Sequence, residues 1–276
     1  MIVKGYVDGD ASKNSELKEV TVNLIGTKAL LDMMPFDKML EIPAGNITGE
    51  SAINKFGSND EIVDETKEEV WDGSATYVFP ATALMTSISQ TADQEAMRGA
   101  TIELQGLDAN WDAVTQTAVL GNPTTTVVTL TTPMIRCFRM KVLANVVSDS
   151  PIRCHNAGET QDYAIIGIGN NQTLMAVYTV PNGKTAYMTS YYGDYVRDSV
   201  KDPDSVLFQL WFADRDNSYA FQLKHEKGIP KQAPGFQHKF KPYYKATQKT
   251  DIIITATPDG ADAHVHAGFD IILRDN

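Results

Sequence analysis

The chain has 276 residues, of which 42% are hydrophobic and 21% charged, so it can bury one large core or two smaller ones, and wholesale disorder is excluded. Its 35 acidic and 24 basic residues give a formal net charge of -11, which repels phosphate backbones and argues against nucleic acid as the main partner. The N-terminus has no continuous apolar stretch, and no segment approaches the roughly 18 apolar residues that a membrane span requires, so we expect a soluble protein with no membrane partner.

Residues 1–65 form the least regular part of the sequence. They contain one convincing strand pattern at 20–25 and an apolar stretch at 29–40 that Pro35 interrupts. The run from 42 to 60 is rich in turn formers. We therefore predict an irregular N-terminal arm over 1–65 that packs on its own body or on a neighbour, with Phe56 as an anchoring residue.

From Asp93 to Met140, apolar residues recur at every second position between Gly, Asn, Asp and Pro breaks, which is typical of β-strands. Ile102 and Leu104 alternate with Glu103 and Gln105, which puts the apolar pair on one face of a strand. This region predicts a β-sandwich domain over 66–158, ending in a stretch without strong apolar pattern at 148–162.

A second series of short strand patterns begins near Tyr163, and the sequence VPNGK at 180–184 indicates a hairpin turn. Such spacing, without helical patterns in between, favours antiparallel sheets. We predict an all-β fold of two tandem antiparallel β-sandwich or jelly-roll-like domains, the second over 159–276. A single larger sandwich built from both halves is the alternative.

Candidate chemistry is sparse. His264 and His266 lie two apart on an expected strand and so share a face, where Asp262 could join them as a metal ligand, but no further ligand spacing supports such a site. We expect no catalytic residues, no cofactor and no metal. Cys137 and Cys154 are too few for a disulfide framework, and we expect buried free thiols.

The local charge distribution is more informative. Segment 57–72 carries seven acidic residues against Lys67 and sums to about -6; the predicted contact residues there are Asp60, Glu61, Asp64, Glu65, Glu68 and Glu69. Segment 221–249 carries seven lysines against Glu226 and sums to about +6; its predicted contact residues are Lys239, Lys241 and Lys245. The hypothesis is that one segment docks on the other segment of a second subunit, while the alternative is two independently solvated surfaces.

Several tyrosines of the second half suggest a different use. Tyr191, Tyr192, Tyr243 and Tyr244 could form an aromatic platform for a sugar, because aromatic faces stack on the C–H surfaces of sugars. Tyrosine is also abundant on sheets and at protein interfaces, so this pattern does not identify a glycan site by itself.

Several phrases of the sequence resemble a family of virion structural proteins of tailed bacteriophages that is frequent among marine phages. They include INKFGSNDEIVDETKEEVWDGSATYVFP, GLDANWDAVTQTAVLGNPTTTVVTL, IRCFRMKV, YTVPNGKTAYM and the closing AGFDIILRDN, so the resemblance extends from Ile53 to the C-terminus. The chain departs from the family pattern at RGA, where a glycine-rich GTGA is expected, and at LGNPT, where a simpler Asn-Gly turn is expected.

This resemblance implies an accessory component of the phage particle, assembled in the host cytoplasm. We expect a non-enzymatic capsid decoration or cement protein, homo-oligomeric and trimeric, whose partners are itself and the major capsid protein or other virion proteins. The alternative is a receptor-binding or glycan-binding module of a tail or fibre. An enzyme acting on polysaccharide is the weakest of the three hypotheses.

Overall fold

The computed structural model describes residues 3–5, 20–22, 37–73, 76–197, 201–233 and 235–276. The chain forms two compact units, residues 1–48 and residues 49–276. The predicted all-β class is confirmed, because 56% of the described residues lie in strands, 3% lie in helices, and the sheets are antiparallel. Within the described residues, no helix is both long enough and apolar enough to span a bilayer.

The first unit contains little regular structure among its described residues. Strand β1 (Val3–Gly5) pairs antiparallel with β2 (Val20–Val22), which falls within the strand predicted at 20–25. The short helix α2 (Lys38–Glu41) begins after Asp37, whose carboxylate accepts a hydrogen bond from the backbone N–H of Met39 at 3.0 Å. This is an ordinary N-terminal cap, which satisfies one of the free amides of the first turn.

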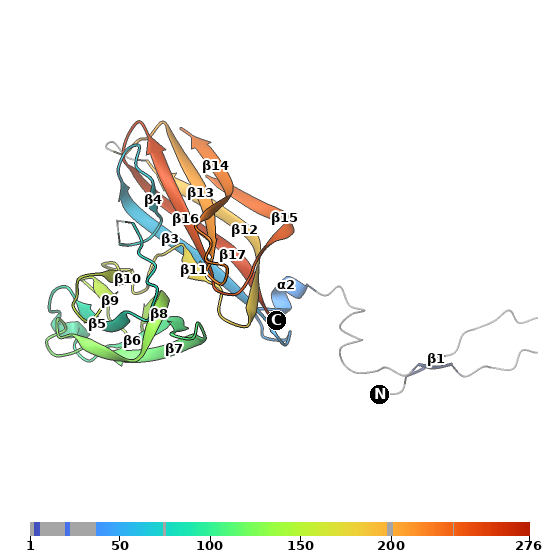
Figure 1. The fold of residues 1–276 in the computed structure, drawn as a ribbon, viewed down its shortest axis with the longest axis horizontal. Coiled ribbons are helices and arrows are strands. Elements are labelled where there is room, and N and C mark those ends of the chain that lie inside the picture. The colour runs from blue at the N-terminus through green and yellow to red at the C-terminus, as the bar shows by residue number, and fades with distance from the viewer. Residues whose placement is uncertain (1–2, 6–19, 23–36, 74–75, 198–200, 234) are drawn as a thin grey trace, which may run out of the picture. The chain divides into compact units, whose positions relative to one another are not determined.

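The second unit is built around a β-sandwich (Figure 1). Its four-stranded sheet has the order β15 (Phe236–Ala246), β12 (Lys184–Val196), β17 (Ala263–Asp275), β3 (Glu50–Ile62). Its five-stranded sheet has the order β14 (Gln222–Pro230), β13 (Ser205–Asp214), β16 (Thr250–Asp259), β11 (Val177–Thr179), and β4 (Glu68–Glu69) also pairs with β16. Alternate residues of β17, such as Val265, Phe269 and Ile271, fill the core between the two sheets.

Strand β3 corrects the predicted extent of the irregular arm. Residues 50–62 pair with β17 from Glu50 opposite Arg274 to Ile62 opposite Ala263, so they belong to the sandwich. The strand lacks apolar alternation because its inward positions carry Lys55, Gly57 and Asn59. The prediction assigned these residues to a region rich in turn formers. These residues face the backbone of other segments rather than apolar side chains: Lys55 donates from Nζ to the carbonyl of Phe138, and Asn59 donates from Nδ2 to the carbonyl of Glu69 at 3.1 Å.

A six-stranded sheet is inserted between β4 and β11. Its order is β10 (Asp162–Ile166), β9 (Ile152–His155), β5 (Met85–Gln90), β8 (Val128–Val142), β6 (Thr101–Asp108), β7 (Ala113–Val119), with one turn of 3-10 helix, η1 (Glu95–Met97), before β6. The first half of β8 pairs with β5 and its second half with β6, and Met134 is a partner in both ladders. Its buried residues form a separate hydrophobic core.

The domain boundaries therefore lie elsewhere than expected. The sandwich takes β3 and β4 from before the insertion and β11 to β17 from after it, while β10 at 162–166 belongs to the inserted sheet although it was assigned to the second domain. The unpatterned stretch at 148–162 includes β9 and the turn that returns the chain to β10, and is not a linker between domains.

Cys137 and Cys154 lie in the inserted core as free, buried thiols. The neighbouring Cys137 side chain, together with burial, raises the pKa of the Cys154 thiol.

A buried ion cluster joins the inserted sheet to the sandwich. Arg136 on β8 donates to Asp251 on β16 through Nε and Nη2, both at 2.9 Å, and both side chains are almost fully buried. The same carboxylate accepts from Arg215 at 2.6 Å and from the hydroxyl of Thr179 at 2.6 Å. The Arg136 guanidinium is further 4.8 Å from the ring centre of Trp111, so its charge is enclosed on several sides.

Candidate functional site

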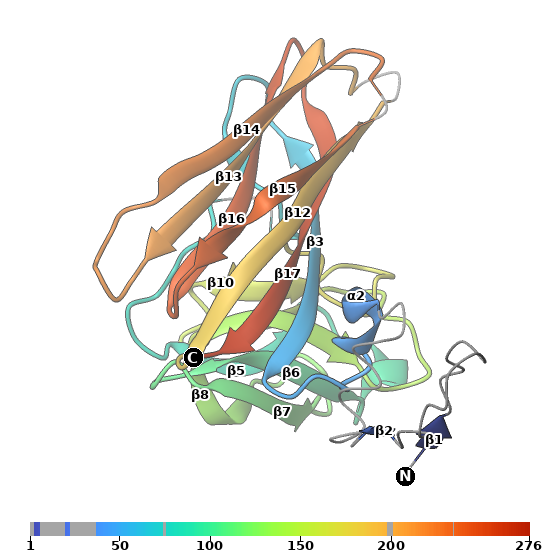
Figure 2. The same cartoon turned by 90° about the vertical axis from the view of Figure 1, so that its right-hand side faces the viewer.

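The two sheets of the sandwich leave two open borders on opposite sides. On one side the sheets end at β15 and β14. On the other side the four-stranded sheet ends at β3, and the five-stranded sheet ends at β4 and β11, which both pair with β16. Figure 2 shows β14 beside β13 and β15 beside β12, each as the last strand of its sheet on this side. An edge strand exposes unpaired backbone groups, so each border can bind a partner or must be protected from one.

The border formed by β14 and β15 is basic. Among the described residues, no ion pair forms to Lys239, Lys241 or Lys245, which occupy exposed, outward positions of β15. Two other lysines of the predicted basic segment are paired internally, Lys231 with Asp202 and Asp204, and Lys249 with Asp216. We call the remaining set the basic border: Lys224, Lys227, Lys239, Lys241 and Lys245.

The opposite border contains the predicted acidic segment, but part of it has internal roles. Glu68 accepts a hydrogen bond from Asn59 at 3.2 Å, Asp64 accepts from the backbone of Gly260 at 2.8 Å, and Glu69 accepts from the backbone of Tyr77 at 3.1 Å. Burial raises the pKa of Glu69. The exposed carboxylates of this acidic border are Asp60, Glu61 and Glu65.

The predicted arm anchor, Phe56, lies on β3 at the same border. It is half-buried and stands opposite Gly268 of β17 in the register of the two strands. Its backbone is therefore part of the four-stranded sheet. Phe56 is held in place by this pairing and does not anchor a separate arm.

The two histidines considered as weak metal candidates lie side by side on the outward face of β17, with ring centres 4.7 Å apart. His264 contacts Asp60 at 3.0 Å, and His266 contacts Asp194 at 2.9 Å, so each histidine has its own carboxylate. Asp262 does not join them, because its carboxylate accepts from the backbone of Asp64 at 2.9 Å. No group of three metal-ligating side chains occurs among the residues that the structure describes.

The predicted platform of four tyrosines is not assembled. Tyr191 is fully buried, and its hydroxyl lies 2.5 Å from Nδ1 of His225. Tyr192 lies on the outward face of the four-stranded sheet, where its hydroxyl accepts from Asn54 at 3.3 Å. The physical reason is the period of two in a strand: neighbouring residues point to opposite faces, so 191 and 192 separate, as do 243 and 244.

Two histidines line the opening between the two sheets at their β14 and β15 edges, which we call the mouth of the sandwich. The rings of His225 on β14 and His238 on β15 are 4.1 Å apart, and His238 also contacts Phe240 at 4.7 Å. Burial, and to a lesser extent the neighbouring His238, lower the pKa of His225, which favours its neutral form as a partner of Tyr191.

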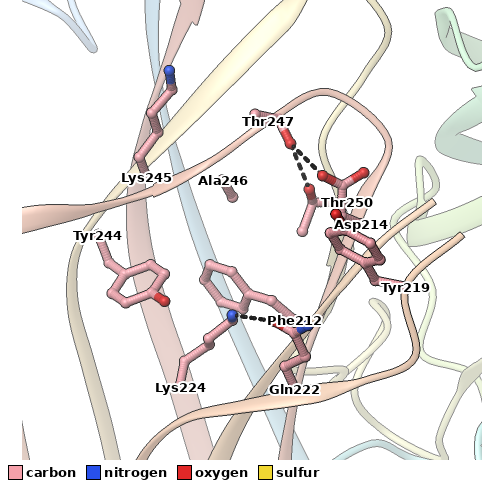
Figure 3. Close-up of a pocket in the computed structure, with 10 residues that line it drawn as sticks. All are labelled: Phe212, Asp214, Tyr219, Gln222, Lys224, Tyr244, Lys245, Ala246, Thr247 and Thr250. Carbon is pink, nitrogen blue, oxygen red and sulfur yellow. Dashed lines mark hydrogen bonds between the residues drawn. The ribbon is translucent and has the colours of Figure 1, made fainter. Parts of the chain in front are cut away.

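A pocket of about 270 Å³ opens at the other end of this mouth (Figure 3). Phe212 and Tyr244 meet edge to face in it, with ring centres 5.2 Å apart at 86°. Asp214 accepts from the side chain of Asn217 at 2.8 Å and from the hydroxyl of Thr247 at 3.1 Å. Sequence reasoning found Tyr244 but missed Phe212, Asp214 and Tyr219, since these come from β13 and the turn after it, where no motif marks them.

A second pocket of about 370 Å³ lies beside the acidic border. Asp72 lines it and accepts from the backbone N–H of Leu174 at 3.0 Å and of Gly167 at 3.4 Å. Burial raises the pKa of Asp72 to about 7 in spite of these two hydrogen bonds.

Comparison with known proteins gives no further guide to the site. No protein-family model matches the chain, and no curated protein matches it at the significance threshold of the search.

Proposed function

We propose that the protein is a non-enzymatic structural component of a tailed-phage particle, a capsid decoration or cement protein that acts by contacts between its own subunits and with the major capsid protein. The observation that carries this proposal is the opposite charge of the two borders of one sandwich. The resemblance of the sequence from Ile53 to the C-terminus to phage virion proteins supports it independently.

The placement of the charges favours a head-to-tail contact. When one surface of a subunit binds a different surface of the next, the assembly closes into a ring if the rotation permits. Here the basic border, whose Lys239, Lys241 and Lys245 form no ion pair with any described residue, would meet the exposed Asp60, Glu61 and Glu65 of a neighbouring copy. A closed trimer is the ring that we expect, with charge setting register and association rate more than affinity.

The first test is the composition of purified particles. Quantitative mass spectrometry of phage particles should find this chain in hundreds of copies, in a simple ratio to the major capsid protein. A few dozen copies would support a tail or fibre location in place of decoration. Absence from mature particles would refute the virion role altogether.

The second test addresses the contact itself. Replacing Lys239, Lys241 and Lys245 together by Glu should abolish the oligomer of the purified chain at low ionic strength, as measured by analytical ultracentrifugation. Replacing Asp60, Glu61 and Glu65 together by Lys should do the same. Mixing the two variants should restore contacts between unlike copies and give mixed complexes, but no closed trimer, because a ring of three subunits cannot alternate two kinds. An unchanged oligomer in either triple variant, or no mixed complex on mixing, contradicts the head-to-tail contact.

A further inference from the structure

We propose that the pocket between β14 and β15 is a binding site for a saccharide that carries a carboxylate. This inference does not depend on the virion role, because the pocket is formed within one subunit. Its lining comes from both sheets of the sandwich and from the turn after β13: Phe212, Asp214, Tyr219, Gln222, Lys224 and Tyr244 (Figure 3).

Aromatic rings bound the pocket on two sides. Tyr244 is half-buried and held edge to face against Phe212, whose ring is almost fully buried. Tyr219 lies across the pocket with 51% of its surface exposed, next to Asp214 (Figure 3). Aromatic side chains with an apolar face and a polar hydroxyl suit the apolar C–H face and polar rim of a sugar ring.

The polar groups supply both kinds of hydrogen-bonding partner. The carboxylate of Asp214 is oriented by Asn217 and Thr247 and can accept from sugar hydroxyls. The ammonium of Lys224 donates to Gln222 at 2.7 Å and lies 5.8 Å from the ring centre of Tyr244, so it is held at the pocket. A few placed polar groups in an aromatic-lined hollow are the usual composition of a ligand site.

The charge balance selects an acidic ligand. Lys224 and Lys245 both line the pocket against the single carboxylate of Asp214, and the other lysines of the basic border lie farther along β14 and β15. A positive field of this kind attracts an anion and raises its local concentration. The volume of about 270 Å³ lies just below the roughly 300–1,000 Å³ of pockets for drug-sized ligands, which fits one or two sugar rings.

Lysines on edge strands also prevent unwanted strand pairing, and Lys227 fits that role. Lys224 differs, because Gln222 holds it beside Tyr244. If Lys224 only protected the edge strand β14 from pairing, neither this hydrogen bond nor the oriented carboxylate of Asp214 in the same pocket would be required.

The experiment uses the full chain and a panel of acidic oligosaccharides, namely oligogalacturonate, oligomannuronate and oligosialic acid, with neutral galactose and mannose oligomers as controls. Saturation-transfer NMR detects binding, and calorimetry gives the affinity. At least one acidic probe should bind, and Tyr244→Ala should weaken it by about tenfold. The matched control is Tyr243→Ala, because Tyr243 is 50% exposed, does not line the pocket and should change affinity by less than about twofold.

Tyr244 packs on Phe212, so Tyr244→Ala can also loosen β15 and weaken binding indirectly. A second variant that does not change this packing is therefore needed. Lys224→Gln leaves the packing intact and should weaken the acidic probe about fivefold and remove most of its salt dependence. The proposal is overturned if no acidic probe binds, if a neutral probe binds as well as its acidic counterpart, or if Tyr243→Ala has the same effect as Tyr244→Ala. Ultracentrifugation of Lys224→Gln distinguishes this proposal from the subunit contact. If saccharide binding is lost while the oligomer is unchanged, the substitution has acted on the pocket alone.

Discussion

Asp251→Asn should be one of the most destabilising single substitutions in the protein. The Asp251 carboxylate is fully buried and accepts four hydrogen bonds, two from Arg136, one from Arg215 and one from Thr179. Arg136 lies 115 residues away on the inserted sheet and is only 3% exposed, so removing the carboxylate leaves its positive charge buried without a counterion. Its remaining partners are neutral, the carbonyls of Pro80 and Ile135 at 2.7 and 2.8 Å.

The magnitude follows from this asymmetry. Breaking a buried ion pair by removing one partner typically costs about 3–5 kcal/mol, since the other charge stays desolvated. Such a loss is a large part of the roughly 5–15 kcal/mol by which domains are stable. Arg215 is 30% exposed and can turn toward water, so Arg215→Gln should cost no more than about 1 kcal/mol and serves as the matched control.

Urea denaturation followed by tryptophan fluorescence and far-ultraviolet circular dichroism measures both variants. The double variant Arg136→Met with Asp251→Asn should lose less free energy of unfolding than the sum of the single variants, because neither member then leaves the other charge unpaired. A loss below about 1 kcal/mol for Asp251→Asn, or strict additivity in the double variant, would refute the reasoning.

Two further predictions concern buried groups that titrate near neutrality. Burial lowers the pKa of Lys55 from 10.5 to about 7, which corresponds to roughly 5 kcal/mol against its charged form. Between pH 7 and 10.5 the unfolded chain therefore binds more protons than the folded chain, so stability rises with pH. Lys55→Met removes this cost but also removes the hydrogen bond to the carbonyl of Phe138. The variant should therefore be more stable than the wild type by about 2 kcal/mol at pH 7 and no more stable at pH 10. Burial raises the pKa of Asp72 from 3.8 to about 7, so the folded chain binds more protons in this window and stability falls as pH rises through it. Asp72→Asn should match the wild type near pH 4 and exceed its stability by up to roughly 4 kcal/mol at pH 8, since its amide oxygen can still accept from Leu174. Urea titrations at the two ends of each window check both predictions, and a difference from wild type that does not change with pH would contradict them.

The sequence was sufficient for the fold class and for strands whose two faces differ in polarity. Ile102 and Leu104 are both buried in β6, as their alternation with Glu103 and Gln105 predicts. The pattern failed at β3, because its inward face meets backbone instead of a hydrophobic core. A Cβ at Gly57 would lie 2.3 Å from the carbonyl oxygen of Val70, so only glycine permits this approach.

The candidate site was less predictable than the fold. The local charge segments could be counted from the sequence, but their internal partners could not, because Asp202 lies 29 residues from Lys231 and Gly260 lies 196 residues from Asp64. The pocket was missed for a related reason. Its aromatic residues Phe212 and Tyr244 come from different sheets, and only the closed sandwich brings them together.

The polar contacts of the inserted sheet fix where it meets the sandwich. Besides the Arg136–Asp251 pair, Arg139 donates to the carbonyl of Asn54 at 2.8 Å and Lys55 donates to the carbonyl of Phe138, so β8 is tied to β3 and to β16 by directional bonds. Buried ionic contacts of this kind add little net stability compared with apolar packing, but they fix relative position, because a shift leaves charges unpaired. The insertion therefore meets the sandwich beside β3 and β11, on the side opposite to β14 and β15. This arrangement keeps the basic border and the pocket next to it open to a second subunit or a saccharide.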